Sequence, residues 1–395
     1  MPIGTPFHSR TAPLCISQNW RIWSGYYIAS SYEVLHDFEY HAIRNAAALI
    51  DVSPLYKYEL TGNDTEKLLN RILTREIRRC AVSQAMYTCL CNEAGKVIQD
   101  GTVFRLGEHH YQLNLADPSY RWLKLNACGL DVQIEDVSED AAVLAVQGPL
   151  SRDILKQITA ADLDRLRFFR LVFAKIGDVS GIISRTGYTG DLGYELWVPS
   201  THALRVWDAL IEAGKNFGLT PAGMLALDMA RIEAGFILIE VDYTGAEKAL
   251  ISAQHYSPFE IGLGWTVDMG KEHFIGKKAL VKQQKEGIPR QTVGLEIDWD
   301  DFERLYQEKG LAPQVPTTAW RGSAPVSKDQ KQVGRATSGT WSPAVKKYIA
   351  LATIETESAG IGTRLTMEIT VEHERKKVAA TVVKTPFFDP PRKRA

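Results

Sequence analysis

The sequence lacks a long apolar run, a disulfide framework and an excess of one charge. No stretch reaches the roughly 18 apolar residues of a transmembrane helix, and residues 1–10 contain no basic segment that leads into an apolar one, so neither a membrane span nor a secretory signal is indicated. The five cysteines are an odd number and indicate reduced thiols in a cytoplasmic protein. Lys and Arg number 46 against 47 Asp and Glu, a net charge of -1 that argues against nucleic-acid binding as the main role.

Several catalytic and metal-binding patterns are also missing. Cys89 and Cys91 alternate along an expected strand and share one face, but a zinc site needs two more ligands and no His or Cys pair follows at matching spacing. We therefore predict no metal. No G-x-G-x-x-G follows a strand, and neither a Walker lysine motif nor a G-x-S-x-G elbow occurs. Carboxylates, aromatic rings and backbone geometry remain as carriers of any chemistry.

The composition is that of a soluble globular protein with more than one domain. The 395 residues, 45% of them hydrophobic and 24% charged, are too many for one ordinary core. The pattern changes near residues 286–290, from helices mixed with strands to mostly strands. We predict an α+β region at 1–286, a β-barrel or sandwich at 287–389 and a solvated basic tail at 390–395. The proline-rich stretch between Tyr306 and Lys331 is expected to be a loop.

Local patterns predict individual elements. Asn63 or Asp64 can begin a helix whose apolar positions extend to Ile77, and Thr201 can begin another that closes at Gly214 or Gly218. Strands are expected at residues 56–60, 101–106, 111–115, 142–146, 363–371 and 377–383. The second and third of these strands are joined by four residues, which predicts an antiparallel hairpin.

The most unusual stretch is residues 185–199, RTGYTGDLGYELWVP. Glycines at 187, 190 and 193 allow a tight fold and a close approach of a flat ligand to the backbone. Glu195 follows at the start of a strand, with Tyr188 nearby. An ordinary glycine-rich hairpin with a surface glutamate explains this pattern. The functional alternative is a carboxylate beside aromatic rings, which suits a planar heterocycle with adjacent N–H donors.

A second constellation places a carboxylate in a strand. The turn at residues 92–95 leads into a largely apolar segment that contains Asp100, a residue type that strands disfavour. Asp100 either pairs with Arg105 or Lys96, or acts as an acid that hydrogen-bonds or polarises a reacting nitrogen. Further on, Asp228 and Arg231 are helical neighbours, which favours a structural ion pair.

Together these stretches resemble the folate-dependent aminomethyltransferases, the family of the glycine cleavage system T-protein. The matching segments, in the family's order, are 48–53, 92–95 with Asp100, 145–149, 185–195, 231–235, 274–280, 333–343 and 384–387. The resemblance implies a cloverleaf of three domains around a central folate channel, with two interleaved α+β domains in 1–286 and the barrel at 287–389.

The resemblance also implies an activity and a site. The family moves an aminomethyl group from a lipoyl carrier protein to tetrahydrofolate. Glu195 matches the glutamate that binds the pterin ring, and Asp100 matches the catalytic aspartate near the folate nitrogen that receives the one-carbon unit. Tyr188 is expected to complete the folate-binding group. No covalent enzyme intermediate is needed, because catalysis would depend on positioning and on the carboxylate.

The chain departs from the family pattern on the expected donor side. Gln99 stands where T-proteins usually have a first aspartate, and Leu227 stands where they have an arginine, which removes a cation and a donor fork. Aromatic residues Trp23, Tyr26 and Tyr27 could stabilise a methylated cation. They could equally be core residues.

These departures define an alternative within the same chemistry. The folate half of the site would be preserved and the donor half changed, giving a demethylase of a free small methylated compound with Trp23, Tyr26, Tyr27 and Gln99 near the donor. A second alternative is a non-catalytic folate-binding regulatory protein. It is disfavoured by Asp100 and by the absence of the K-G-C-Y-x-G-Q-E motif of that branch. A third, part of a larger amine oxidase, would need its flavin-binding half on a separate subunit.

Overall fold

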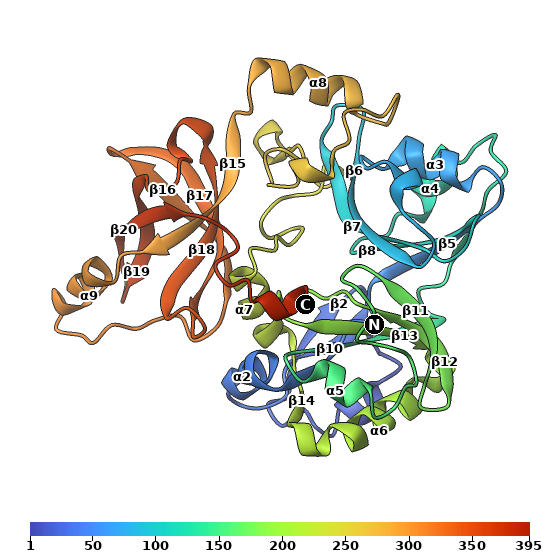
Figure 1. Ribbon diagram of the computed structural model, residues 1–395. Helices are drawn as coiled ribbons and strands as arrows, with labels where there is room; N and C mark the ends of the chain where they lie inside the picture. The colour runs from blue at the N-terminus through green and yellow to red at the C-terminus, as the bar shows by residue number, and fades with distance from the viewer. The chain divides into compact units, whose positions relative to one another are not determined.

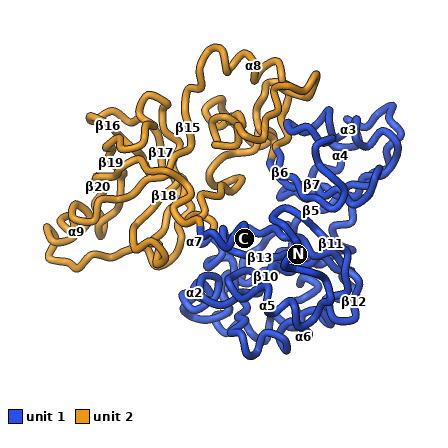
Figure 2. The backbone as a smooth tube through the Cα atoms, viewed as in Figure 1, with its two compact units in different colours: residues 1–88, 100–230, 390–395 blue, residues 89–99, 231–389 orange.

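The computed structural model describes all residues, 1–395, and has the predicted α+β composition. The chain forms two compact units (Figure 2). Unit 1 comprises Met1–Thr88, Asp100–Ala230 and Pro390–Ala395, and unit 2 comprises Cys89–Gln99 and Arg231–Asp389. Each unit is therefore built from segments that are distant in sequence. No helix is both long enough and apolar enough to cross a membrane.

Unit 1 contains a six-stranded sheet. Its order is β11 (Leu171–Ile176), β12 (Val179–Ser184), β13 (Gly193–Pro199), β10 (Ala141–Gln147), β4 (Ala47–Asp51) and β14 (Leu219–Pro221). Helices α5 (Ser151–Leu155) and α6 (Ala203–Gly214) cover one face (Figure 1). Trp207 and Leu210 of α6 pack there against Leu196 and Val146 in one apolar core. The helix predicted after Thr201 is confirmed, although no side chain caps its start.

A five-stranded sheet carries the predicted hairpin. Its order is β6 (Gln84–Cys91), β7 (Val97–Arg105), β8 (His110–Leu115), β5 (Tyr56–Thr61) and β9 (Gln133–Asp136), with β7 and β8 antiparallel as expected. Helices α3 (Thr65–Ile72) and α4 (Tyr120–Asn126) lie beside it (Figure 1). The helix predicted as far as Ile77 ends at Ile72, because Leu73 is extended and Ile77 begins a separate 3-10 turn, Ile77–Arg79.

The N-terminal residues add a small three-stranded sheet to unit 1. Its order is β1 (Ile3–Gly4), β3 (Tyr26–Ser31) and β2 (Asn19–Trp23), followed in sequence by helix α2 (Asp37–Asn45). Helix α1 (His8–Thr11) lies between β1 and β2 in sequence.

Unit 2 contains the predicted barrel. Six strands close it in the order β15 (Arg290–Ile297), β18 (Lys347–Glu355), β17 (Lys331–Ser342), β16 (Trp320–Lys328), β19 (Arg364–Val371) and β20 (Glu374–Val383). Helix α9 (Trp299–Gln307) packs Phe302 and Leu305 into the barrel core. The expectation of a loop throughout 306–331 is wrong, because β16 occupies part of it. The segment has few apolar residues, so the sequence did not indicate a strand, but hydrogen bonding to β17 makes it one. Helices α7 (Met224–Glu233) and α8 (Lys277–Glu286) precede the barrel.

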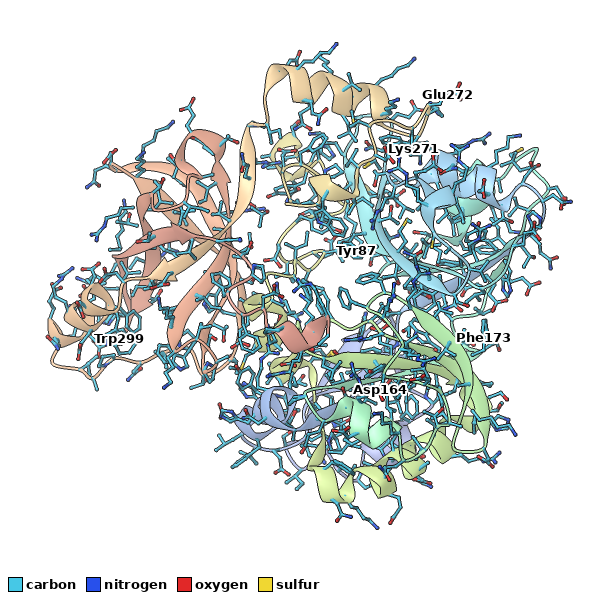
Figure 3. All side chains as sticks on the ribbon, viewed as in Figure 1. Tyr87, Asp164, Phe173, Lys271, Glu272 and Trp299 are labelled. Carbon is cyan, nitrogen blue, oxygen red and sulfur yellow. The ribbon has the colours of Figure 1, made fainter.

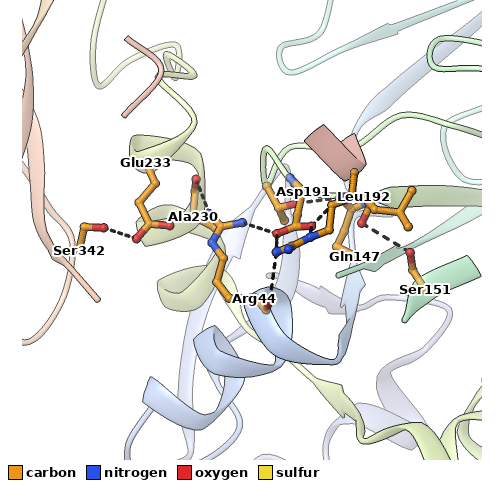
Figure 4. A network of polar contacts seen from close by, with 10 residues as sticks. Arg44, Gln147, Ser151, Asp191, Leu192, Ala230, Glu233 and Ser342 are labelled. Atoms are coloured by element: carbon orange, nitrogen blue, oxygen red, sulfur yellow. Dashed lines mark hydrogen bonds and ion pairs between the residues drawn. The ribbon is translucent and has the colours of Figure 1, made fainter. Parts of the chain in front are cut away.

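The expectation of a solvated tail at 390–395 is also wrong. Arg392 forms an ion pair of 2.7 Å with Asp191, and Arg44 approaches the same buried carboxylate at 3.3 Å. Figure 4 shows this network next to the loop that precedes β13. Residues 390–395 therefore pack within unit 1 through the Arg392 guanidinium, which was expected to be exposed to solvent.

Candidate active site

Strand β13 presents two different faces. Tyr194, Leu196 and Val198 point into the apolar core beneath the sheet. Because side chains alternate along a strand, Glu195 and Trp197 lie on the opposite face, which α5 and α6 do not cover. The glutamate singled out from the sequence is therefore on the face of the six-stranded sheet that is free of helices.

The hairpin of the five-stranded sheet is arranged in the same way. On β8, Tyr111, Leu113 and Leu115 are buried and alternate with Gln112 and Asn114. Asp100, Thr102 and Phe104 alternate along β7, and the register pairs Thr102 with Asn114. One face of this hairpin is thus apolar, and the other carries Asp100 with a row of polar groups.

The two polar faces are turned toward each other. The rings of Phe104 and Trp197 meet edge to face, with centroids 5.1 Å apart and an interplanar angle of 78°. Phe104 lies on the same side of β7 as Asp100, and Trp197 lies on the same side of β13 as Glu195. The structure therefore brings the two predicted carboxylates onto facing sheets within unit 1.

Asp100 is held by a phenol. The hydroxyl of Tyr87, on β6, donates a hydrogen bond of 2.5 Å to Oδ2 of Asp100 (Figure 3 labels Tyr87). A short hydrogen bond from a phenol restricts the orientation of the carboxylate that accepts it. The two structural partners considered for Asp100 bind other groups: Arg105 donates to the carbonyl of Cys80 at 3.0 Å, and Lys96 lies 3.5 Å from Glu260.

Two buried amides extend this polar face. Gln112 donates to Asn114 at 2.7 Å, and Asn114 donates to Thr102 at 3.3 Å. Sequence reasoning passed over them and Tyr87. The signal for the amides was present, since Gln112 and Asn114 interrupt an apolar strand at every second residue, but that pattern usually marks a solvent-facing side. For Tyr87 the sequence contained no distinguishing signal.

Glu195 is half-buried and is held by hydroxyls. Thr186 donates through Oγ1 to Oε2 of Glu195 at 2.6 Å, which leaves Oε1 for a ligand. Burial raises the pKa of the Glu195 carboxyl above its usual value, while the hydroxyls of Thr186 and Ser184 act in the opposite direction. A carboxylate with one engaged and one available oxygen fits a heterocycle that offers N–H donors, as a pterin does.

The loop before β13 is fixed by Gln147 of β10. Its amide nitrogen donates to the carbonyls of Thr186 at 3.2 Å and Tyr194 at 3.3 Å, and Thr189 donates to its amide oxygen at 2.8 Å. A Cβ at position 187 or 193 would collide with this amide. These glycines are expected from the sequence to allow a tight fold and the approach of a flat ligand, but at both positions Gln147 fills the space. Half-buried Tyr188 lies within the loop so clamped.

The predicted donor residues do not gather on one surface. Trp23 and Tyr26 are cross-strand partners in the hairpin of β2 and β3, so their side chains share a face. Tyr27 points to the other face, where its ring lies 6.4 Å from that of His8. Gln99 is buried and, next to Asp100 on β7, points to the opposite side of that strand. One ligand cannot meet Trp23, Tyr26 and Tyr27 on a single sheet face.

Arg231 has a structural role within unit 2. It forms an ion pair of 2.5 Å with Asp242, and both side chains are buried. Asp242 also accepts hydroxyl hydrogen bonds from Thr337 at 2.6 Å and Ser338 at 2.7 Å. The family segments 231–235 and 333–343 are therefore joined here through Asp242. No group of three or more His, Cys, Asp or Glu side chains converges as a metal site.

Two family models match this chain. The family model described as the GCVT N-terminal domain matches residues 15–271, and that of the glycine cleavage T-protein C-terminal barrel domain matches residues 307–389. The chain belongs to the glycine cleavage T-protein family. The family predicted from the sequence motifs is therefore confirmed.

Individual relatives agree with this assignment. The aminomethyltransferase of Caldanaerobacter subterraneus subsp. tengcongensis is 36% identical over 355 residues, which cover 89% of this chain and 87% of that protein. The trimethylamine-oxide aldolase of Ruegeria pomeroyi is 35% identical, over 99% of this chain and 47% of its own length. The crystal structure of the glycine cleavage system aminomethyltransferase T from Bartonella henselae has the same fold, with a TM-score of 0.82, 22% identity and 98% coverage of both chains.

Proposed function

We propose that this protein is a transferase that moves a one-carbon unit, as an aminomethyl or methyl group, from a donor to tetrahydrofolate. Family membership and aminomethyltransferase relatives that align over 89% of the chain support this function. The observation that carries it is the ring contact between Phe104 and Trp197, because Asp100 and Glu195 lie on the two faces that this contact joins. The alternative of a non-catalytic folate-binding protein is disfavoured by these transferase relatives.

The site residues divide into binding and chemical roles. Glu195 accepts N–H groups of the pterin through Oε1, and Tyr188 borders that ring from the loop held by Gln147. Asp100 faces the folate nitrogen that receives the carbon, and Tyr87 keeps its carboxylate oriented. Tetrahydrofolate itself supplies the nucleophilic nitrogen. The chain contributes position and a fixed negative charge beside the cationic centre that forms as the carbon is transferred.

The direct test is product identification. The purified protein is incubated with tetrahydrofolate and either an aminomethylated lipoyl carrier protein or a set of small methylated amines, and methylene- or methyl-folate is measured by mass spectrometry. We expect turnover with one donor class. Asp100→Asn should lower kcat by roughly 100-fold or more, as expected for loss of a charge that stabilises the transition state, with folate Kd changed less than threefold. Absence of folate binding by the wild-type protein would contradict the proposal.

A second candidate differs only in the donor. The trimethylamine-oxide aldolase relative aligns over 99% of this chain, against 89% for the aminomethyltransferase relative. Leu227 is an apolar, buried side chain on α7 at the position where the family pattern has an arginine. Both observations favour a free methylated amine over a lipoyl carrier protein. Turnover with the carrier protein alone would exclude this candidate.

A further inference from the structure

Glu195 stands at the end of a chain of three hydrogen bonds. The indole Nε1–H of Trp197 donates to Oγ of Ser184 at 3.2 Å, the hydroxyls of Ser184 and Thr186 are 2.7 Å apart, and Thr186 donates to Glu195 at 2.6 Å. The side chains of Trp197, Ser184 and Thr186 are all buried. Water therefore does not compete for these bonds, and each group depends on its neighbour for a partner.

The register of strands β12 and β13 brings the residues of these hydrogen bonds together. Strands β12 and β13 pair antiparallel, so that Ser184 lies opposite Glu195 and Ile182 lies opposite Trp197. Thr186 follows two residues after Ser184, and its carbonyl is held by the Gln147 amide at 3.2 Å. The hydrogen bond from Gln147 fixes the backbone of Thr186, and this backbone positions the Thr186 hydroxyl next to the Glu195 carboxylate.

The chemistry of the first group sets the direction of the whole chain. An indole N–H is only a donor, so Ser184 must accept from Trp197. Its own proton then points to Thr186, and the proton of Thr186 points to Glu195. The reverse direction would turn the Ser184 proton toward Glu195, whose backbone carbonyl lies at 3.4 Å, and would leave Oε2 of Glu195 without the Thr186 proton. In the favoured direction Oε2 of Glu195 is an acceptor, so the Thr186 proton occupies this oxygen.

We propose that Thr186 is a positioning residue that fixes Oε2 of Glu195 and thereby turns Oε1 toward the N–H groups of the bound ligand. The inference rests on the proposed function, because the ligand is taken to be tetrahydrofolate. It adds a specificity device: the carboxylate has one orientation and accepts hydrogen bonds only, so heterocycles that offer acceptors at this edge are rejected. Asp100 and Tyr87 lie on the five-stranded sheet and take no part in these three hydrogen bonds.

Removing the Thr186 hydroxyl should affect binding and leave the chemical step intact. Without it, Oε2 loses its donor at a buried position, and the carboxylate is both less oriented and less favoured. We expect Thr186→Val to raise Kd and KM for tetrahydrofolate roughly 10- to 100-fold, the range of a hydrogen bond to a charged group. The kcat at saturating folate should stay within twofold. Thr186→Ser, which restores the hydroxyl, should recover binding to within threefold of wild type.

A matched control is available in the same sheet. Thr220 of β14 donates through its hydroxyl to the carbonyl of Gly218 at 3.2 Å and serves no site residue, so Thr220→Val should leave Kd and KM unchanged. Ser184→Ala interrupts the chain one step earlier and is the second test variant if Thr186→Val does not fold; it should raise Kd by a smaller factor. Thermal melting of each variant checks the fold.

The outcomes separate the inference from the function on which it rests. Loss of folate binding in Glu195→Ala together with wild-type Kd in Thr186→Val would overturn the inference and leave the proposed function standing. A fall in kcat at unchanged KM, or a Thr186→Ser variant as impaired as Thr186→Val, would overturn it as well. If the wild-type protein and Glu195→Ala both fail to bind tetrahydrofolate, the proposed function itself is wrong.

Discussion

At the scale of single residues, the two carboxylates of the site are held by different partners. A phenol orients Asp100, whereas a chain of hydroxyls that begins at an indole orients Glu195. Under the proposed function, these contacts orient Asp100 toward a developing cation and Glu195 toward N–H donors.

The phenol beside Asp100 should matter for turnover. We expect Tyr87→Phe to lower kcat about 10-fold, since loss of one hydrogen bond to a charged group costs roughly 1.5–3 kcal/mol and only part of it is specific to the transition state. Steady-state kinetics with saturating tetrahydrofolate measure this. Tyr120→Phe is the control, because the Tyr120 hydroxyl bonds a carbonyl on β9 at 3.4 Å, away from Asp100. Unchanged kcat in Tyr87→Phe would remove Tyr87 from the site.

The raised pKa of Glu195 predicts a pH dependence of binding. Binding needs the carboxylate, and burial lifts its pKa above the usual 4.5, so folate affinity should fall at a higher pH than an exposed glutamate would give. Glu195→Gln should bind weakly and lack this acidic limb. Kd measured across a pH series for both proteins provides the test, and an identical limb in the two would contradict the assignment.

The raised pKa of Glu195 stabilises the folded protein at low pH, whereas folate binding needs the ionised form. The folded state favours protonated Glu195, so its contribution is full below the unfolded pKa and is lost as pH rises through the folded pKa. The Tm of wild type should consequently lie below that of Glu195→Gln at neutral pH, and the gap should close on acidification.

At the scale of elements, the glycine-rich loop is specified by the side chain that it encloses. Gln147 bonds the loop at Thr186, Thr189 and Tyr194, and the glycines at 187 and 193 leave room for it. The motifs 145–149 and 185–195, far apart in sequence, are thus one structural unit. The network around Asp191 holds the far side of the same loop (Figure 4).

A small substitution in this loop should disturb the site. Gly187→Ala places a methyl group on the Gln147 amide, and we expect a loss of about 1–3 kcal/mol of stability, as for overpacked positions, with weaker folate binding as the loop moves. Gly107→Ala is the control, since its Cβ would meet only His110, at 3.4 Å. Thermal melting and folate Kd for both variants measure the effect. Equal behaviour of the two would show that Gln147 does not constrain the loop.

At the scale of the whole molecule, the domain boundaries follow contacts more than sequence order. Residues 89–99 belong to unit 2, where Val97 bonds the carbonyl of Tyr256 at 2.8 Å and Lys96 approaches Glu260. Arg290, the first barrel residue, bonds the same Glu260 at 2.8 Å. The segment before the barrel is therefore a packed part of unit 2 as well as a linker.

The barrel itself should fold alone. We propose that residues 287–389 form an independent domain, because the six strands close on one core and leave no open sheet edge. The isolated fragment should show β-type circular dichroism and a cooperative melt. A fragment of 1–286 is the comparison, and it should melt without full cooperativity because it lacks most of unit 2. An unfolded barrel fragment would show that the preceding segment is required.

The sequence by itself determined the composition of the fold, and it singled out Asp100 and Glu195 as candidate site residues. Alternation predicted the hairpin of β7 and β8 and the barrel strands β19 and β20, and the strand that carries Glu195 was also expected, because these patterns depend on local geometry. The sequence did not predict the helix end at Ile72, strand β16 or the packing of the tail. In each of these the deciding partner is distant in sequence or carries no local signal.

Only the tertiary structure decided which side chains meet. Strand alternation states that Asp100 and Phe104 share a face, and that Glu195 and Trp197 do, but not that the two faces oppose each other. It could not assign Tyr87 to Asp100 or Thr186 to Glu195. The expected donor surface grouped Tyr27 with Trp23 and Tyr26, but Tyr27 lies on the other face of the hairpin. The physical reason is that local sequence sets the direction of a side chain, whereas packing between sheets sets its neighbours.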